Sequence, residues 1–371
     1  MTASQVYFTD VRAPVDQPER WYQPKLSAVN KLGRLVLKSG ILDNISKGDQ
    51  VAIKTHFGVH GTTKPLRPVF IRKVVQMVKD KGGKPFVTET TGLGMTKERS
   101  FAVSKIETAE ENGYTSQTLS APIIIADGLQ GFDGVEVQVE GLQLKKVYVA
   151  RHIAEADKVI SLAHFKGHID SGFGGALKSI GVGCIAKPSK YDVHIREPPT
   201  VNPERCTKCG ACIDICPVDA IKDWKIDPTK CVRCQGCAEV CKDAISLNWV
   251  SSQELCERLT DCAKAVIDCV GRENFRYVNF LLDITPHCDC CPYSDNPIVP
   301  DLGILASDDI LAIDKASVDM VNQAPTLPNS MAKCDEDKFH AIFEWTHSKY
   351  QLEAAEKLGL GSMKYEVIKV E

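Results

Sequence analysis

Eight of the sixteen cysteines in this 371-residue chain fall into two short runs with the same internal spacing. The first run, residues 206–217, reads C-T-K-C-G-A-C-I-D-I-C-P, and the second, residues 231–241, reads C-V-R-C-Q-G-C-A-E-V-C. Both have the C-x2-C-x2-C-x3-C spacing of bacterial ferredoxins, in which three close thiolates hold one [4Fe-4S] cluster and the fourth thiolate reaches the other cluster. The triplet Asp-Ala-Ile follows each run, at 219–221 and 243–245, which indicates an internal duplication.

The spacing therefore predicts a module with two [4Fe-4S] clusters over residues 199–247, which would pass single electrons at low potential. A pair of zinc sites is the alternative, because C-x2-C pairs also bind zinc, but the duplication favours the ferredoxin reading. Lys242 stands where the second run would carry proline, and this removes no ligand. The expected ligands are Cys206, Cys209, Cys212 and Cys241 for the first cluster, and Cys231, Cys234, Cys237 and Cys216 for the second.

Composition and charge narrow the remaining classes. With 43% hydrophobic and 25% charged residues, a chain of this length can bury a core and form two or three domains. The N-terminal residues lack the basic and apolar stretches of a leader, and no apolar run of 18 residues occurs, so we expect a cytoplasmic protein without a membrane span. Thiols stay reduced in that compartment, which favours metal binding over disulfides. The net charge of -3 without a basic block argues against nucleic acid as a partner.

Outside the cysteine-rich runs, short apolar strands alternate with helical patterns. This alternation predicts an α/β fold with a mostly parallel sheet and helices on both faces, into which the ferredoxin module is inserted. The first part of the α/β domain would be residues 1–198 and the second part residues 248–371. We expect strands at 50–54, 84–88, 159–163, 277–283 and 302–306, and helices at 69–81 and 252–270.

Two of these strands run directly into the same motif, H-F-x-x-H. It occurs at His56 and His60 after the first strand, and at His164 and His168 after the third. Ligands of open parallel sheets bind beyond the carboxyl ends of the strands, so these four histidines are candidate catalytic residues. The alternative is that each is a loop histidine hydrogen-bonded to backbone.

Polar and glycine-rich stretches follow the histidine motifs. Thr62, Thr63, Lys64 and Arg67 offer hydroxyl groups and cations to an anionic ligand, and Lys178 supplies a further charge within the glycine-rich segment 172–184. Neither a Walker A spacing nor a dinucleotide fingerprint is present, so ATP and NAD are not expected.

Five motifs together resemble the DUF362 family. They are K-T-H-F-G at 54–58, A-H-F-K-G-H at 163–168, G-F-G-G-A-L-K at 172–178, T-P-H-C-D-C at 285–290 and P-D-L-G-I-L-A-S at 300–307. With the ferredoxin segment, they make the chain similar to the branch of that family described as iron-sulfur centre proteins, over about residues 51–323. The resemblance implies an α/β domain of unassigned function joined to iron-sulfur clusters, and it implies no substrate. The chain departs from the family pattern at Cys291.

Three further thiols, Cys288, Cys290 and Cys291, follow the strand at 277–283 and predict a third site. One form is another iron-sulfur cluster with Cys184 as the fourth ligand. A second is a single metal ion bound by Cys288 or Cys290 together with His164 or His168, with Asp295 and Asp301 as outer partners. A third is a redox-active thiol pair near Lys178. The alternative is a purely structural role, in which the thiols fill the core, as we expect of Cys256, Cys262 and Cys269.

Two classes of function are compatible with these features. In the first, the protein is an oxidoreductase that passes electrons through two clusters to a strand-end site holding a small anionic substrate or a metal. In the second, it is a noncatalytic electron carrier or assembly factor that docks on a larger redox enzyme. A ferredoxin-like or flavodoxin-like protein would be the electron donor or acceptor in either case. The substrate, the direction of electron flow and the oligomeric state, with a homodimer as one option, are not determined by the residues.

Overall fold

A computed structural model of the chain describes residues 3–15, 18–332 and 336–371. Its centre is an eight-stranded sheet with the strand order β16-β1-β15-β14-β7-β2-β3-β4. Five of the seven strand pairings are parallel, and β15 runs antiparallel to both neighbours. The strands are β1 (Ser4–Thr9), β2 (Gln50–Lys54), β3 (Lys84–Glu89), β4 (Ile123–Ile125), β7 (Lys158–His164), β14 (Phe275–Leu281), β15 (Gly303–Ser307) and β16 (Tyr365–Lys369).

Alternating side chains of the central strands feed two separate cores, one on each face of the sheet. In β2, Ala52 belongs to one core while Val51 and Ile53 belong to the other, as the two-residue period of a strand requires. The helices that cover the Val51 face are α1 (Ala28–Lys38), α2 (Pro68–Asp80), α3 (Ala102–Glu111) and α4 (Ser116–Leu119). Those that cover the Ala52 face are α5 (Arg151–Ala154), α6 (Ala176–Gly181), α10 (Ser252–Val270), α11 (Ile310–Gln323) and α13 (Ser348–Lys357).

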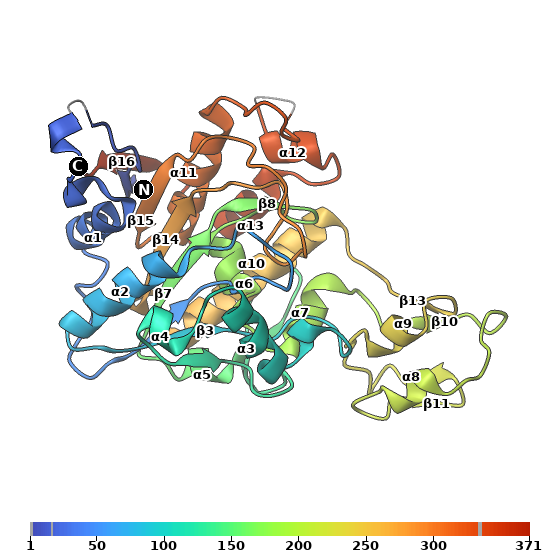
Figure 1. The fold of residues 1–371 in the computed structure, drawn as a ribbon. Helices are drawn as coiled ribbons and strands as arrows, with labels where there is room; N and C mark the ends of the chain where they lie inside the picture. The colour runs from blue at the N-terminus through green and yellow to red at the C-terminus, as the bar shows by residue number, and fades with distance from the viewer. Residues whose placement is uncertain (1–2, 16–17, 333–335) are drawn as a thin grey trace.

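This arrangement confirms the predicted α/β fold with a mostly parallel sheet and helices on both faces (Figure 1). The expected strands and helices agree with the observed ones within about two residues at each end, because their apolar patterns are set locally. Smaller elements complete the body: the hairpins β5 (Gly134–Gln138) with β6 (Lys146–Ala150) and β8 (Lys166–His168) with β9 (Gly172–Gly174), and the helices α7 (Lys187–His194) and α12 (Lys338–Ile342). Short 3-10 helices lie at Pro18–Arg20, Pro24–Leu26, Glu98–Ser100 and Arg272–Asn274.

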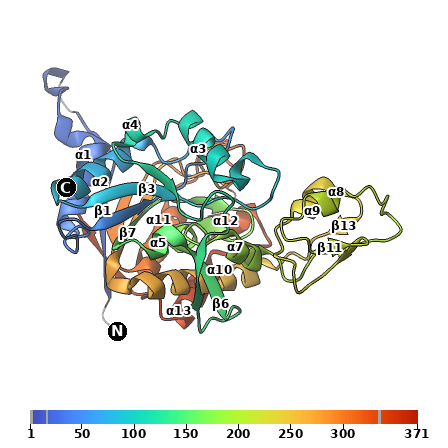
Figure 2. The ribbon, with the colours of Figure 1, turned by 90° about the horizontal axis from the view of Figure 1, so that it is seen from below.

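The cysteine-rich segment projects from this body as a lobe (Figure 2). It contains two small antiparallel ribbons and two short helices, α8 (Ala211–Asp214) and α9 (Gly236–Val240). The ribbons are β10 (Thr200–Val201) with β13 (Ile245–Ser246) and β11 (Ile221–Lys222) with β12 (Lys225–Ile226). The chain enters and leaves the lobe at adjacent points, since the Arg196 amide donates to the Asn248 carbonyl over 2.8 Å. Strands from both sides of the segment therefore share one sheet.

Among the described residues, none of the helices combines the length and the apolar character needed to cross a lipid bilayer.

Candidate functional site

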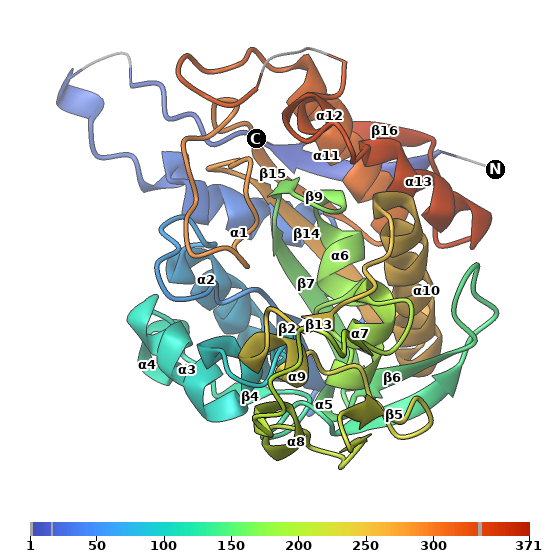
Figure 3. The ribbon, with the colours of Figure 1, turned by 90° about the vertical axis from the view of Figure 1, so that its right-hand side faces the viewer.

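A cavity of about 650 Å³ lies between the carboxyl ends of the central strands and the cysteine-rich lobe. Figure 3 views the molecule from the side of the lobe, whose helices α8 and α9 lie in front of the body. The last residues of three neighbouring strands, Lys54, Glu89 and His164, reach its wall. The lobe supplies the opposite wall through Gln235, at the start of α9, and Glu239. This position is the one in which open α/β sheets bind ligands.

Positive side chains dominate the lining. Eight cations face three carboxylates: Lys54, Lys97, Arg99, Lys105, Lys166, Lys178, Lys190 and Lys242 against Glu89, Asp170 and Glu239. Two buried carboxylates behind the wall add partial compensation, because Asp289 pairs with Lys166 at 3.3 Å and Asp127 with Lys190 at 3.4 Å. The remaining excess of positive charge suits an anionic ligand.

Glu89 organises the end of β3. Its carboxylate lies 2.9 Å from the Lys105 ammonium and accepts the Phe57 amide over 3.1 Å. Burial opposes ionisation of Glu89, but its interactions with His56, Lys105 and Lys54 outweigh it and lower its pKa to about 2. Burial lowers the pKa of His56 to about 3, so this ring is neutral near pH 7. Its Nδ1 accepts the Gly58 amide over 2.8 Å, which leaves the proton on Nε2.

Two lysines of the cavity are buried away from water. The Lys54 ammonium donates to the Thr55 carbonyl over 2.6 Å, and the pKa of Lys54 is lowered by burial. Burial likewise lowers the pKa of Lys190, which extends from α7. Ammonium groups with lowered pKa values release protons more readily, so both can act as proton donors to a bound ligand.

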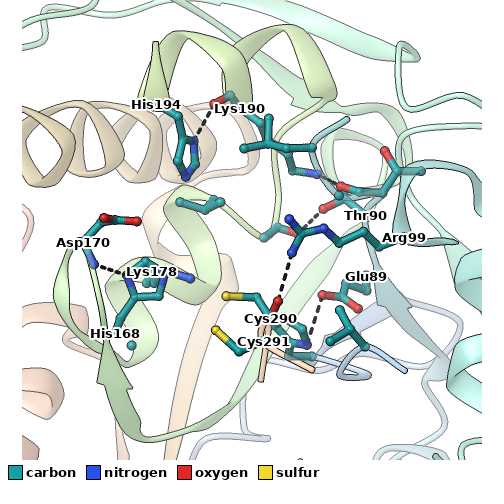
Figure 4. A pocket seen from close by; sticks show the side chains of 18 of the residues that line it. Glu89, Thr90, Arg99, His168, Asp170, Lys178, Lys190, His194, Cys290 and Cys291 are labelled. Carbon is teal, nitrogen blue, oxygen red and sulfur yellow. Dashed lines mark hydrogen bonds and ion pairs between the residues drawn. The ribbon is translucent and has the colours of Figure 1, made fainter. Parts of the chain in front are cut away.

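The segment 288–291 forms a turn beside the cavity and carries three thiols, of which Cys290 and Cys291 are seen in Figure 4. The Cys291 amide donates to the Cys288 carbonyl over 2.8 Å, and the Cys290 carbonyl accepts from Arg99 over 3.0 Å. Cys290 and Cys291 line the cavity, whereas Cys288 is buried behind them. The sulfur atoms of Cys288 and Cys290 and one ring nitrogen of His168 lie within 4.8 Å of one another. The structure thus brings together Cys288, Cys290 and His168, three of the residues that the sequence suggests for a third site.

Charge and hydrogen bonding differentiate these thiols. The hydrogen bond with Cys290 and burial raise the pKa of Cys288 well above its usual value, whereas a hydrogen bond from Cys290 lowers the pKa of Cys291. The Lys178 ammonium lies 3.7 Å from the Cys288 sulfur. Burial would lower the pKa of Lys178, but the neighbouring sulfur groups of Cys288 and Cys290 raise it.

His164 lines the cavity but has no free ring nitrogen. Its Nδ1 lies 2.9 Å from the Asp289 carboxylate, and its Nε2 lies 2.9 Å from the Leu282 carbonyl. The ring therefore holds the turn of residues 288–291 in place through Asp289, and both of its nitrogens face protein oxygens rather than the cavity.

Five of the other expected site residues lie outside the cavity. His60 is exposed and pairs with Glu111 over 2.7 Å, because Gly58 and Gly61 take left-handed backbone angles that turn the loop away after His56. The remaining four residues make contacts with other residues of the body. Thr62 and Thr63 hydrogen-bond to Ser294, and Lys64 and Arg67 form ion pairs with Asp283.

Cys184 also lies apart from the group of Cys288 and Cys290. It is buried in the core with its thiol 3.7 Å from the Ser179 carbonyl, and burial raises its pKa to about 11. Asp301 accepts the Asp283 amide, Asp295 accepts the Asn296 amide, and neither residue lines the cavity. Of the cysteines expected on the long helix, Cys256 and Cys262 are buried and Cys269 is half-buried.

Sequence reasoning missed Glu89, Arg99, Lys190 and His194, all of which line the cavity. Glu89 ends a predicted strand, so the strand-end rule applied to β3 would have found it. Lys190 and His194 are four residues apart on α7 and therefore share one helical face, but nothing local indicates what that face contacts. Arg99 has no local signal, because only the tertiary fold brings it to Cys290.

Within the lobe, the two cysteine runs have the same backbone geometry. Lys208 and Arg233, each directly before the second cysteine of its run, have left-handed φ values of 57° and 55°. The thiol groups gather in two sets. One set lines a small cavity of about 20 Å³ and consists of Cys216, Cys231, Cys234 and Cys237. In the other set, burial is the main cause that raises the pKa of Cys212, and the nearby thiols of Cys241, Cys206 and Cys209 raise it further.

The second run contacts the body directly. Cys234 packs against Met95 and Tyr191, and the Glu239 carboxylate accepts the amides of Met95 and Thr96 over 2.7 and 3.0 Å. The part of the lobe that carries Cys234 and Cys237 therefore borders the large cavity, whereas α8 lies farther from the body in Figure 1.

The fold and site define an α/β protein with a strand-end cavity that a cysteine-rich lobe borders on one side. Residues 51–319 match the family model described as "Domain of unknown function (DUF362)", and the chain belongs to this family. Over 161 residues it is 25% identical to the thylakoid-associated protein sll1697 of Synechocystis. The matched region covers 42% of this chain and 45% of that protein. The chain thus spans less than half the length of this curated relative.

The chain also matches two solved structures at low similarity. One is the lactate racemase apoprotein from Thermoanaerobacterium thermosaccharolyticum, with 12% identity and a TM-score of 0.37, covering 76% of this chain and 56% of that one. The other is a structural-genomics target from Thermotoga maritima, with 11% identity and a TM-score of 0.41, covering 81% of this chain and 60% of that one.

Proposed function

We propose that this protein is an iron-sulfur oxidoreductase that exchanges electrons between two [4Fe-4S] clusters in the lobe and a small anionic substrate in the large cavity. One observation carries the proposal. The cavity has the second cysteine run on one wall and a set of cations at the strand ends on the other. A carrier that only shuttled electrons between proteins would have no use for such a lined cavity.

The lobe fits the clusters by the chemistry of its donors. Each of the two thiol sets contains four cysteines, which is the ligand number of a [4Fe-4S] cluster. Backbone amides also point at ligand sulfurs, as Ala220 does at Cys216 over 3.2 Å and Arg233 at Cys231 over 3.4 Å. When bound, the clusters supply low-potential transfer of single electrons.

The residues of the body bind the substrate and handle its protons. Arg99 and Lys54 are placed to hold anionic groups, since Arg99 has a buried Nε without a partner in the described structure. The neutral His56 presents an Nε2 hydrogen, and Lys54 and Lys190 are proton donors. The lobe covers one side of the cavity, and the buried position of Lys54 and Lys190 strengthens their electrostatic contacts.

Metal analysis of protein prepared without oxygen tests the clusters. We expect about eight iron and eight sulfide atoms per chain. Cys212→Ser and Cys237→Ser should each lose one cluster signal in the reduced state, whereas Cys269→Ser, on α10, should match the parent protein. Zinc in place of iron would overturn the proposal.

Anion binding tests the cavity. With inorganic phosphate and malonate as probes in calorimetric titrations, we expect Arg99→Gln and Lys54→Met to weaken binding of at least one probe by about tenfold or more. Arg67→Gln is the matched control, because this cation lies outside the cavity and pairs with Asp283. If neither probe binds the parent protein, or Arg67→Gln is equally weakened, the cavity is not an anion site and a noncatalytic carrier becomes the better description.

A further inference from the structure

We propose that Cys288 and Cys290 form a two-electron dithiol-disulfide couple, reduced through the lobe and oxidised by a small anionic disulfide bound in the cavity. This inference rests on the proposed function and names the class of its substrate. It assigns a chemical role to the thiols that the eight cysteines of the lobe leave over.

The two thiols have the placement that such a couple needs. Their sulfur atoms lie within 4.8 Å of each other, and one residue separates them in the chain. Cys290 faces the cavity and can attack a bound molecule, whereas Cys288 is only 2% exposed and lies behind it. An accessible attacking thiol with a buried resolving thiol is the arrangement required for thiol-disulfide exchange.

The hydrogen bonds of His168 argue against a metal ion at the same place. Its Nδ1 accepts the backbone amides of Asp170 and Ser171, both over 3.1 Å. A nitrogen that accepts hydrogen bonds carries no proton, so the proton of the neutral ring is on Nε2. An Nε2-H can donate to a sulfur atom, but it cannot ligate a metal. His168 is thus arranged to stabilise a thiolate.

Lys178 supports the same conclusion. Its ammonium lies 3.7 Å from the Cys288 sulfur, where it would repel a metal cation. Its positive charge lowers the pKa values of Cys288 and Cys290 against the burial that helps to raise both, and it can return a proton to a thiolate formed in the exchange. Arg99, which donates to the Cys290 carbonyl, fixes the turn from the opposite side.

The exchange steps balance in atoms and electrons. The Cys290 thiolate attacks one sulfur of the bound disulfide, which breaks its S-S bond and releases one small thiolate. Cys288 then attacks the Cys290 sulfur, releases the second thiol and closes the Cys288-Cys290 disulfide. Two electrons, delivered singly through the lobe from a low-potential protein donor, and two protons restore the dithiol. The cationic lining of the cavity binds the negative groups of the substrate.

Counting electrons separates this couple from the clusters. In an anaerobic reductive titration of oxidised protein, the two clusters accept about two electrons and a disulfide accepts about two more. We expect about four electrons for the parent protein and about two for the Cys288→Ser, Cys290→Ser double variant. Cys291→Ser should still accept about four. Equal uptake by the parent and the double variant would overturn the proposal.

Mass analysis of the thiols identifies the bond. After incubation with glutathione disulfide and acid quenching, alkylation should leave Cys288 and Cys290 joined and Cys291 modified. Cystamine, a cationic disulfide, should oxidise the pair at least about tenfold more slowly, because the cavity is cationic.

Three results of this mass experiment would each refute the couple. They are three alkylated thiols in every state, a bond between Cys290 and Cys291, and protection from alkylation that only a chelator removes. The proposed function fails separately, through the iron and sulfide contents of the parent protein.

Discussion

At the scale of single residues, exposure separates histidines that occur in identical motifs. His56 and His168 lie against the cavity with Nδ1 bound to backbone amides, so each presents an Nε2 hydrogen. His60 occupies the same motif position as His168, yet it lies at the surface, where the hydrogen bond that it donates to Glu111 raises its pKa. The same residue type in the same pattern thus supplies a neutral donor in one loop and a surface ion pair in the other.

The pH dependence of stability should reveal the environment of His56. Burial lowers its folded-state pKa to about 3, against an unfolded value of about 6.5. Between these values the unfolded chain binds more protons, so this residue makes stability fall as pH falls below about 6.5. In anaerobic thermal unfolding from pH 7.5 to 5.5, His56→Gln should show a shallower fall, by up to about one proton per molecule. A slope equal to that of the parent protein would contradict this account, and His60→Gln serves as the exposed control.

At the scale of elements, α6 carries Lys178 into the cavity and depends on a carboxylate from another helix. Asp314 of α11 accepts the Ala176 and Leu177 amides at the start of α6, both over 2.8 Å, and also the side chain of Asn279. Buried amides without partners are costly, so the position of Lys178 is linked to the packing of α11 on the sheet.

Asp314→Ala should therefore destabilise the protein by about 2–4 kcal/mol, because it leaves two buried amides unpaired. Asp268→Ala on α10 is the matched control. It removes only the half-exposed pair with Lys264, which is worth about 0.5 kcal/mol or less. Thermal unfolding of the two variants checks the difference, and similar losses would show that Asp314 does not support α6.

The short helix α9 attaches the lobe to the body through Glu239. Its carboxylate accepts the amides of Met95 and Thr96 and lies 3.5 Å from the Lys97 ammonium. Glu239→Ala should speed hydrogen exchange of the Met95 and Thr96 amides by about tenfold or more, since each loses its acceptor. Asp214→Ala, on the exposed side of α8, should leave both rates unchanged. Unchanged exchange in Glu239→Ala would mean that other contacts hold the lobe.

At the scale of the whole molecule, the sheet contains strands from both sides of the cysteine-rich segment, and the two ends of that segment lie next to each other. Ile195 and Trp249 form an isolated bridge, and Arg196 pairs with Asn248 through the backbone, so the ends of the segment are adjacent. A linker of a few residues can therefore span the gap without straining either strand.

Replacing residues 199–247 by a short glycine-serine linker should leave a folded α/β body, which tests the predicted division into 1–198, 199–247 and 248–371. We expect cooperative thermal unfolding at a reduced midpoint, since the contacts of Glu239 and Arg233 with the body are lost. A Glu239→Ala variant of the full chain separates the loss of these contacts from a loss of fold. A broad, noncooperative transition in the deletion alone would show that the two parts do not form one domain.

The sequence by itself determined the features that depend on local spacing. The α/β class follows from apolar periods within single segments, and the two thiol runs are readable because ligands a few residues apart must lie within one loop. The predicted strand-end location of His56, His164, His168 and Cys290 rests on the same local reasoning combined with the general rule for parallel sheets.

Only the tertiary structure decided which distant groups meet. Lys64 and Arg67 form ion pairs with Asp283, and Cys184 faces the core. In contrast, Arg99 and Lys190 reach the cavity from segments without a motif. The reason is physical: strand order and the direction of each loop set the distances between residues far apart in the chain, and a left-handed glycine such as Gly58 can turn a loop away within one residue. Local patterns contain the chemistry of each side chain but not its neighbours.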